Sequence, residues 1–272
     1  MKKSLRFLLL MAALLASVAT ADAQQAADPR VADLVRAGKL RVALHFTQYI
    51  KDPVTSEIRG RGTGLVSVQI AHALAARLGV EVQLVGYPTP PAVVECLKAG
   101  ACDVGFLGIN PSRAAEVGFS PPFVLTPFTY LVPAGSSIRS VADADRPGVR
   151  IAVVRSHEST MALSRILKHA EPVGAEMPDA AFDLLRTGHA DAFASNLPVL
   201  LGYSTKLPGS RVLEDRYGAN LSAMAVAKDQ AGRLAYISEF IEEAKASGLV
   251  QRAIERAGQH GIRFALPGNP TQ

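Results

Sequence analysis

The sequence has no tryptophan, and only six tyrosines and ten phenylalanines occur among its 272 residues. Proteins that bind single-stranded nucleic acid stack bases on aromatic side chains, so this composition argues against that function. The 29 basic and 24 acidic side chains leave a net charge of +5. This is far from the strongly basic surface of nucleic-acid-binding domains, and we expect no nucleic-acid partner.

Cysteine is equally scarce. Two cysteines cannot form the disulfide framework of a small secreted scaffold. Cys96 and Cys102 stand where a predicted helix ends and a predicted strand begins. They could close a short disulfide loop in an oxidising compartment, or they could be two small buried side chains. The sequence leaves both alternatives open.

Motifs for nucleotides, metals and nucleophilic catalysis are also missing. The sequence contains no phosphate-binding loop of the Gly-x-x-x-x-Gly-Lys type, no Gly-x-Ser-x-Gly and no His-Glu-x-x-His. The glycine-rich run at 60–64 lacks the dinucleotide-binding spacing and follows a polar stretch, so we interpret it as a loop before a helix. We therefore expect no cofactor, no metal and no catalytic centre.

Long hydrophobic runs are absent apart from residues 7–19. This run follows Lys2, Lys3 and Arg6 and precedes Ala21-Asp22-Ala23, the pattern of a secretory signal peptide cleaved near Ala23. The alternative is an N-terminal anchor helix, although a membrane span needs about 20 apolar residues. Cleavage would lower the net charge to +3. No cysteine lies near the cleavage site, so we expect a periplasmic protein without a lipid anchor.

What the chain does contain is an alternation of apolar strands and amphipathic helices. Hydrophobic residues make up 49% and charged residues 19%, which favours a folded chain. Strands are predicted at 40–44, 80–84 and 103–107, with helices at 67–78 and from Pro90 to Gly100 between them. This order predicts an α/β fold with a parallel sheet flanked by helices.

The same pattern then recurs. The strand at 149–154 resembles the strand at 40–44, and the stretch 185–193 resembles 97–106, with a helix ending at glycine and a strand starting at aspartate in both. Two similar units favour a two-lobed chain, although such junctions are also generic in α/β proteins. Strand-like stretches at 123–137 and 221–227 would connect the lobes as a hinge. Helices at 231–246 and 249–257 would pack on the first lobe.

One motif carries a resemblance to a known family. The stretch Asn110-Pro-Ser-Arg113-Ala, followed by Phe119-Ser-Pro-Pro-Phe123, resembles a segment of polar-amino-acid-type periplasmic solute-binding proteins, the bacterial extracellular solute-binding family 3. Stretches 38–42, 74–80, 97–103 and 188–192 are similar to the same family. The resemblance implies a type II periplasmic binding protein fold with two crossover strands, one lobe of residues 30–128 plus 226–272, another of residues 129–225, and a ligand between them.

The resemblance implies ligand-binding roles for particular residues. Arg113 would pair with a ligand carboxylate, because guanidinium can bind a carboxylate through two parallel hydrogen bonds; the alternative is a solvated arginine in a helix. The same motif adds Asn110. The turn after the first strand, with His45, would supply an aromatic side chain from Phe46 or Tyr49, unless these rings pack within a lobe.

A second group follows the strand at 149–154. Ser156, His157 and Glu158 occupy the position where the resembled family offers donors to the carboxylate. The alternative is an ordinary helix start, with Ser156 as the N-cap and Ser159 in the first turn. Both can hold at once, because a helix N-terminus has several free N–H groups.

The sequence also departs from the family pattern. Where amino-acid binders carry an aspartate for the ligand ammonium, this chain has Asn196, which supplies no countercharge. The segment 105–110 is also short and poor in hydroxyl groups. We therefore expect a small carboxylate ligand that need not be a standard α-amino acid.

These features predict a monomeric binding protein that delivers a small carboxylate to the membrane permease of an ABC transporter. One alternative is a periplasmic enzyme on the same fold, similar to cyclohexadienyl or arogenate dehydratases, with Glu158 or His157 as general acid. The other is a ligand-sensing partner of a membrane receptor. The ligand itself is not determined by the sequence.

Overall fold

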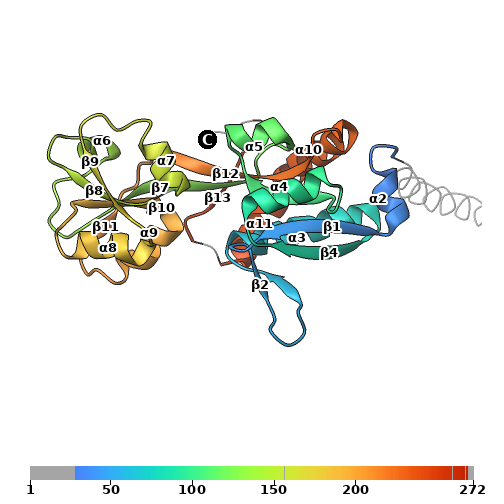
Figure 1. Cartoon of the computed structure of the whole chain (residues 1–272), viewed down its shortest axis with the longest axis horizontal. Helices are drawn as coiled ribbons and strands as arrows, with labels where there is room; N and C mark the ends of the chain where they lie inside the picture. The colour runs from blue at the N-terminus through green and yellow to red at the C-terminus, as the bar shows by residue number, and fades with distance from the viewer. Residues whose placement is uncertain (1–27, 156, 259, 267, 269–272) are drawn as a thin grey trace, which may run out of the picture. The chain divides into compact units, whose positions relative to one another are not determined.

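The computed structural model describes residues 28–155, 157–258, 260–266 and 268. The chain forms two compact units (Figure 1). Unit 1 comprises Met1–Leu107, Pro111–Ser120 and Met224–Glu243. Unit 2 comprises Gly108–Asn110, Pro121–Ala223 and Ala244–Gln272. The predicted signal peptide lies outside the described residues, and none of the helices described is long and apolar enough to cross a membrane.

Unit 1 is built around the parallel strand β1 (Lys39–His45). It pairs with β4 (Glu81–Tyr87) on one side and β5 (Val104–Gly108) on the other, and both pairings are parallel. The helices of this part of the chain are α2 (Ala32–Ala37), α3 (Thr63–Leu78), α4 (Pro90–Lys98), α5 (Pro111–Glu116) and most of α10 (Ala231–Ala246). Strands and helices thus alternate as the hydrophobic pattern predicted.

The sequence did not predict the hairpin that follows β1. Strands β2 (Tyr49–Lys51) and β3 (Ile58–Gly60) pair antiparallel in a small separate sheet. The Asp52 carboxylate accepts hydrogen bonds of 2.8 Å from the backbone N–H groups of Val54 and Thr55, which fixes the turn. The hairpin extends away from the rest of unit 1 in Figure 1.

Unit 2 repeats the parallel arrangement. Strand β8 (Arg150–Val154) lies between β9 (Glu171–Ala175) and β10 (Ala192–Asn196), parallel to both. The antiparallel strand β7 (Val124–Val132), buried along its whole length, borders β10. The helices of this unit are α6 (Val141–Ala144), α7 (Glu158–Leu163), α8 (Pro178–Arg186), α9 (Leu197–Ser204) and α11 (Leu249–Arg256).

The remaining strands pair with β7 or with one another. Strand β12 (Gly218–Ala227) pairs with β7 through its first half, from Gly218 to Ser222. Its second half pairs with β6 (Val117–Phe119) in unit 1. Two short strands, β11 (Arg211–Val212) and β13 (Arg263–Phe264), also pair antiparallel with β7.

The repeated sequence pattern corresponds to a repeated set of contacts. In unit 1 the Asp103 carboxylate accepts hydrogen bonds from the backbone N–H, Nε and Nη2 of Arg41. In unit 2 Asp191 accepts the same three bonds from Arg150. Each pair joins the amino ends of two neighbouring parallel strands. The aspartate therefore has the same structural role at both αβ junctions, which accounts for the repeated sequence pattern.

The two cysteines form a disulfide in this structure. Cys96 in α4 and Cys102 before β5 are joined, and their Cα atoms lie 5.6 Å apart. The Tyr87 hydroxyl also donates a 2.8 Å hydrogen bond to the Cys96 sulfur. Of the two alternatives left open by the sequence, the structure therefore shows the disulfide.

The unit boundaries differ from the predicted lobe boundaries at four places: residues 108–110, 121–128 and 244–272 group with unit 2, and residues 224–225 group with unit 1. The chain joins unit 2 at Pro121, whereas the prediction placed residues up to 128 in the first lobe. Residues from Ala244 onward also group with unit 2. The reason is local: β13 pairs with β7, and the buried Lys245 ammonium donates a 3.2 Å hydrogen bond to the Pro122 carbonyl.

Candidate functional site

The carboxyl end of β1 is held by a tight turn in unit 1. The Gln48 backbone N–H donates to the His45 carbonyl at 2.8 Å, and the Gln48 side chain is buried. The first turn of α3 lies directly against this turn. A Cβ on Gly64 would stand 1.8 Å from the Gln48 carbonyl oxygen, so only glycine fits. The run 60–64, predicted as a loop before a helix, is a loop only at Arg61 and Gly62: Gly60 ends β3, and Thr63 and Gly64 begin α3. Its glycines allow close packing.

The two aromatic residues of this turn lie in different surroundings. The Tyr49 ring covers the backbone of β4, because a Cβ on Gly86 would lie 2.5 Å from the ring. The structure therefore places Tyr49 in the packing of unit 1. Phe46 is 56% exposed, which is unusual for a phenylalanine. Of the two, Phe46 is the ring with free surface for a ligand.

Arg113 lies near the same end of β1. It belongs to the short helix α5, which follows β5, and its side chain is half-buried. Burial is the main reason that the pKa of His45 falls to about 4, and the positive charge of Arg113 lowers it further. His45 is therefore a neutral imidazole at neutral pH, with its Nδ1 atom 3.0 Å from the Thr47 hydroxyl. The structure thus places a fixed cation close enough to a neutral imidazole to lower its pKa, and the exposed Phe46 follows this imidazole in the chain.

Asn110 stands immediately before α5, is half-buried and belongs to unit 2. Sequence reasoning missed its neighbour in that unit, Asn220 of β12. The Asn220 amide lies so close to Gly108 that a Cβ there would come within 2.6 Å of Oδ1. Only the antiparallel pairing of distant segments places this amide at the carboxyl end of β5, so no local signal could have identified it.

In unit 2, the predicted group after β8 begins with Ser156, which lies outside the described residues. His157 follows as the N-cap of α7, and Glu158 is the first residue of that helix. The expected cap was Ser156, and this is corrected: the His157 Nδ1 accepts a hydrogen bond from the Ser159 backbone N–H at 3.3 Å. Imidazole Nδ1 can replace a serine hydroxyl as the capping acceptor because it has a free lone pair when unprotonated.

The capping hydrogen bond also determines which ring nitrogen of His157 carries the hydrogen. Its Nδ1 lies 2.7 Å from the hydroxyl of Ser159, a buried residue. A backbone N–H can only donate, so Nδ1 is the acceptor and the ring hydrogen is on Nε2. Burial lowers the pKa of His157, and the adjacent Glu158 opposes this shift. His157 therefore presents a neutral N–H donor.

Asn196 ends β10 and caps α9. Its Oδ1 accepts a 3.1 Å hydrogen bond from the Val199 backbone N–H. This bond assigns the oxygen of the amide to the helix and leaves the NH2 group directed elsewhere. The amide oxygen thus has a structural role, and the residue provides no negative charge for a ligand ammonium.

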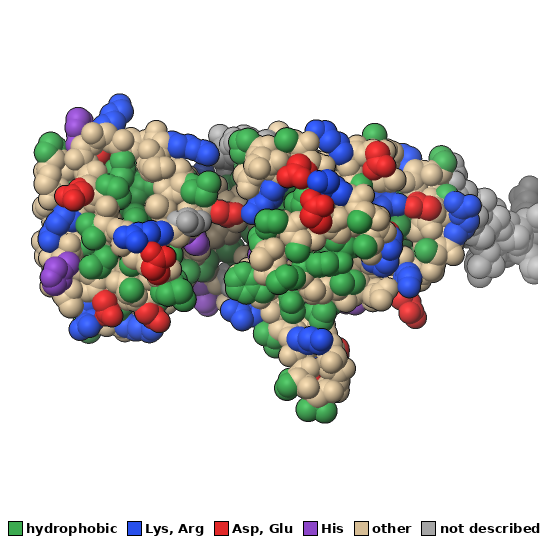
Figure 2. Space-filling view, in the orientation of Figure 1, with side chains coloured by type: hydrophobic (Ala, Val, Ile, Leu, Met, Phe, Trp, Pro, Cys, Tyr) green, Lys and Arg blue, Asp and Glu red, His purple; other side chains and the backbone are tan. Residues whose placement is uncertain are grey.

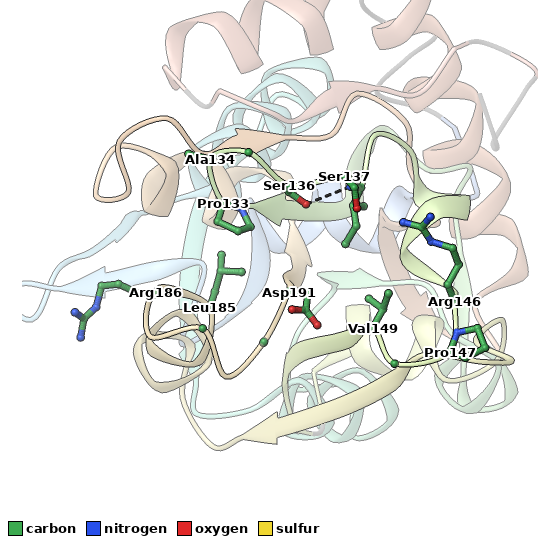
Figure 3. Close-up of a pocket in the computed structure, with 15 residues that line it drawn as sticks. Pro133, Ala134, Ser136, Ser137, Arg146, Pro147, Val149, Leu185, Arg186 and Asp191 are labelled. Carbon is green, nitrogen blue, oxygen red and sulfur yellow. Dashed lines mark hydrogen bonds between the residues drawn. The ribbon is translucent and has the colours of Figure 1, made fainter.

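A cavity of about 630 Å³ lies elsewhere in unit 2, and it contains none of the predicted site residues. Figure 3 shows the Asp191 carboxylate between Leu185 and Val149, with the Arg186 guanidinium pointing away. This cavity is at the amino ends of β8 and β10, whereas His157 and Asn196 follow their carboxyl ends. Ligands of open α/β sheets bind at carboxyl ends, and Asp191 already pairs with Arg150. We place the candidate site at the carboxyl edges.

Among the residues that the structure describes, no three histidine, cysteine or acidic side chains gather as a metal site. Figure 2 shows basic and acidic side chains interspersed on the visible face of unit 2. The carboxyl edge of unit 1 offers the Arg113 cation and the exposed Phe46 ring. The carboxyl edge of unit 2, considered by itself, offers the donors of His157 and Asn196 together with the Arg155–Glu176 ion pair.

Comparison with known proteins identifies the family to which this chain belongs. The chain belongs to the bacterial extracellular solute-binding proteins, family 3, whose model matches residues 53–260. The glutamine-binding protein of Geobacillus stearothermophilus is 25% identical over 199 residues, which are 71% of this chain and 74% of that protein. The virulence sensor BvgS of Bordetella bronchiseptica is 30% identical over 131 residues, 47% of this chain. The match covers 10% of the sensor's length.

Solved structures agree with the family. An ancestral cationic amino acid solute-binding protein, AncCDT-1, matches with a TM-score of 0.64 and 25% identity over 83% of this chain and 98% of that chain. A second structure of AncCDT-1, described as a precursor of cyclohexadienyl dehydratase, has a TM-score of 0.59, 25% identity and coverage of 83% and 97%. The family 3 chain thus has the predicted type II periplasmic binding protein fold, and its relatives are mainly binding proteins.

Proposed function

We propose that this family 3 protein captures a small carboxylate-bearing solute, an amino acid or a related organic acid, in the periplasm and delivers it to the permease of an ABC transporter. One observation carries the proposal: Arg113, a fixed cation, lies beside a neutral His45 at the carboxyl end of the unit 1 sheet. A guanidinium in partly buried surroundings gains most from an anion that can accept two hydrogen bonds. Carboxylate is the anion that amino-acid ligands share.

Further support comes from the donors at the carboxyl edge of unit 2. His157 carries its hydrogen on Nε2 and is neutral, so it donates without adding a charge. The amide NH2 of Asn196 is a second donor, because its oxygen caps α9. We propose that Asn110, Ser156 and Glu158 complete the polar surroundings of the ligand, while Phe46 gives apolar contact and Tyr49 supports it from within unit 1.

The test is thermal unfolding of the purified protein with a panel of amino acids and organic acids. A ligand at about 100 times its dissociation constant stabilises by about 2.7 kcal/mol, which raises Tm by several degrees. Arg113→Ala should abolish the shift, and Arg113→Lys should reduce it because lysine cannot form the bidentate contact. Arg36→Ala, an exposed arginine at the end of α2, is the matched control. A shift that survives in Arg113→Ala would contradict the assigned role.

A dehydratase-like activity is the second candidate. It is favoured by the Nδ1 atom of His157 lying 2.7 Å from the Ser159 hydroxyl, next to Glu158 at the carboxyl edge of β8. Glu158 or His157 would protonate the leaving hydroxyl of a cyclic carboxylate as it departs as water, while the ligand carboxylate is lost as CO₂. An ultraviolet assay for an aromatic product from prephenate or arogenate tests this activity. Formation of the aromatic product would show that the protein is an enzyme. Loss of this turnover in Glu158→Gln would identify Glu158 as the general acid.

A sensing role is the third candidate, and it is favoured by the similarity to BvgS over 131 residues. In that case the ligand-bound protein would act on a membrane receptor instead of a permease. Uptake of labelled ligand by cells that lack this gene distinguishes the roles. Loss of uptake supports transport, whereas normal uptake with a lost transcriptional response supports sensing.

A further inference from the structure

Two exposed apolar side chains of unit 1 lie at one junction of the fold, whereas two others, Ile50 and Val54, belong to the β2–β3 hairpin. Phe46, 56% exposed, follows β1, and Leu65, 36% exposed, lies in the first turn of α3. The turn that carries Phe46 packs directly on that helix start through Gln48 and Gly64. Both residues are thus at the carboxyl end of β1, the edge at which open α/β sheets bind ligands.

The hairpin beyond this junction differs in character. Figure 2 shows hydrophobic side chains at its tip and a basic side chain nearer its base. Val54 at the tip is 90% exposed, and its backbone N–H donates a hydrogen bond to the Asp52 carboxylate, which holds the turn. Val54 is therefore apolar surface in the turn between β2 and β3, whereas Phe46 precedes β2. Val54 gives a natural control for Phe46.

Acidic groups at the carboxyl edge of unit 1 are already engaged. The Asp52 carboxylate accepts two backbone N–H groups, Glu57 pairs with Arg59, and Glu116 at the end of α5 pairs with Lys98. No acidic residue occurs in the stretches 88–90 and 109–113 that follow β4 and β5. A ligand with a cationic side chain would bring a second positive charge to this edge, beyond the α-ammonium that all amino acids carry, and no acidic side chain of these stretches would balance it.

The carboxyl edge of unit 2, considered by itself, has a similar composition. Met161 in α7 and Met177 before α8 are 53% and 65% exposed. Glu176 after β9 pairs with Arg155. Glu158 occupies the first turn of α7, where the helix dipole stabilises an acid without any ligand. Exposed methionines suit apolar ligand groups of variable shape, because their side chains are flexible and polarizable.

Resting on the proposed function, we infer that the captured carboxylate has an apolar side chain, and that Phe46 and Leu65 form the surface that selects it. Arg113 recognises the carboxylate group common to many solutes, and the apolar junction at the end of β1 distinguishes among them. A solute with a cationic side chain would gain nothing from Phe46 and Leu65. This assigns the chain a ligand class different from that of the cationic amino acid binder AncCDT-1, with which it shares 25% identity.

The experiment is isothermal titration calorimetry with L-leucine, L-methionine and L-phenylalanine against L-arginine and L-lysine. We expect at least one of the three apolar amino acids to bind about tenfold or more tightly than either cationic one. Phe46→Ala should weaken that apolar ligand about 10-fold or more, the loss expected for one buried aromatic contact. Phe46→Leu should largely restore it, and Val54→Ala should leave it unchanged.

The outcomes separate this inference from the function on which it rests. Preferential binding of L-arginine or L-lysine overturns the apolar assignment and keeps the binding function. Equal loss in Phe46→Ala and Val54→Ala also overturns it, because the junction would then have no special role. Binding of none of the five amino acids overturns the amino-acid form of the proposed function, and the apolar assignment with it. Because Phe46 is exposed, its substitution leaves the core of unit 1 intact.

Discussion

At the scale of single residues, two aspartates occupy equivalent positions in different surroundings. Asp103 is buried, paired with Arg41, and lies 3.9 Å from the buried guanidinium of Arg233. Asp191 pairs with Arg150 alone, and both of their side chains are 39% exposed. The Arg–Asp pair therefore contributes differently to the free energy of unfolding in the two units, because in unit 1 the buried carboxylate cannot exchange its partner for water.

We predict that Asp103→Asn lowers the free energy of unfolding by about 3 kcal/mol, because it removes the buried carboxylate that pairs with Arg41 and lies 3.9 Å from the buried Arg233 guanidinium, which keeps its ion pair with Asp33. Asp191→Asn should cost about 1 kcal/mol or less, as exposed ion pairs do. Urea unfolding of both variants measures the difference. Equal losses in the two variants would show that burial does not determine how much an Arg–Asp pair contributes to stability.

A second residue-scale prediction concerns His45. Its pKa of about 4 in the folded chain lies below the ordinary value of about 6.5 in the unfolded chain. The unfolded state therefore takes up the proton first, and stability is lost as the pH falls from about 6.5 to about 4, by at most about 3 kcal/mol. His45→Asn should flatten this part of the profile, whereas His72→Asn, an exposed histidine of α3, should not. Urea unfolding at pH 7.5 and 4.5 measures both, and an unchanged profile in His45→Asn would contradict the assignment.

At the scale of secondary-structure elements, the start of α3 depends on close backbone approach. Gly64 allows the helix to lie against the Gln48 carbonyl, which a Cβ would meet at 1.8 Å. The N-cap Gly62 has φ +56°, so the entry to the helix requires a second glycine. Three glycines in five residues therefore serve the geometry of one helix start.

We predict that Gly64→Ala lowers the free energy of unfolding by about 2 kcal/mol or more, because the backbone must move to relieve the clash. Gly202→Ala is the control, since nothing lies within 4 Å of a Cβ added there in α9. It should stabilise by about 0.5–1 kcal/mol, because alanine loses less backbone entropy in a helix. A Gly64→Ala variant as stable as the parent would show that the α3 start is not packed as described.

At the scale of the whole molecule, the chain combines an N-terminal segment outside the described residues with a family 3 binding fold. We predict that export removes residues 1–23, so that the mature protein begins at Gln24, because Ala21 and Ala23 form the small-residue cleavage site. Intact mass and N-terminal sequencing of the periplasmic protein test this. Ala23→Arg should block processing, and a cytosolic protein that retains Met1 would contradict the prediction.

Much of this organisation follows from the sequence alone. Periodicity and glycine positions predicted β1, α4, β5, β8 and α10, because local backbone preferences and one-sided burial determine such elements. The Arg113 motif identified the family before any coordinates. Residue type also determined that Arg113 is a permanent cation, since guanidinium does not lose its proton in proteins.

Only the tertiary structure decided the rest. The capping role of His157, the Asn220 amide beside Gly108 and the pairing of β13 with β7 depend on segments meeting across a turn or from distant parts of the chain. So does the contrast between Tyr49, packed over Gly86, and Phe46, left exposed. The sequence determined which chemical groups are present, because these are properties of single residues. Tertiary packing decided which groups remain free to bind a ligand, because burial and hydrogen-bond partners are set by the neighbours that folding brings together.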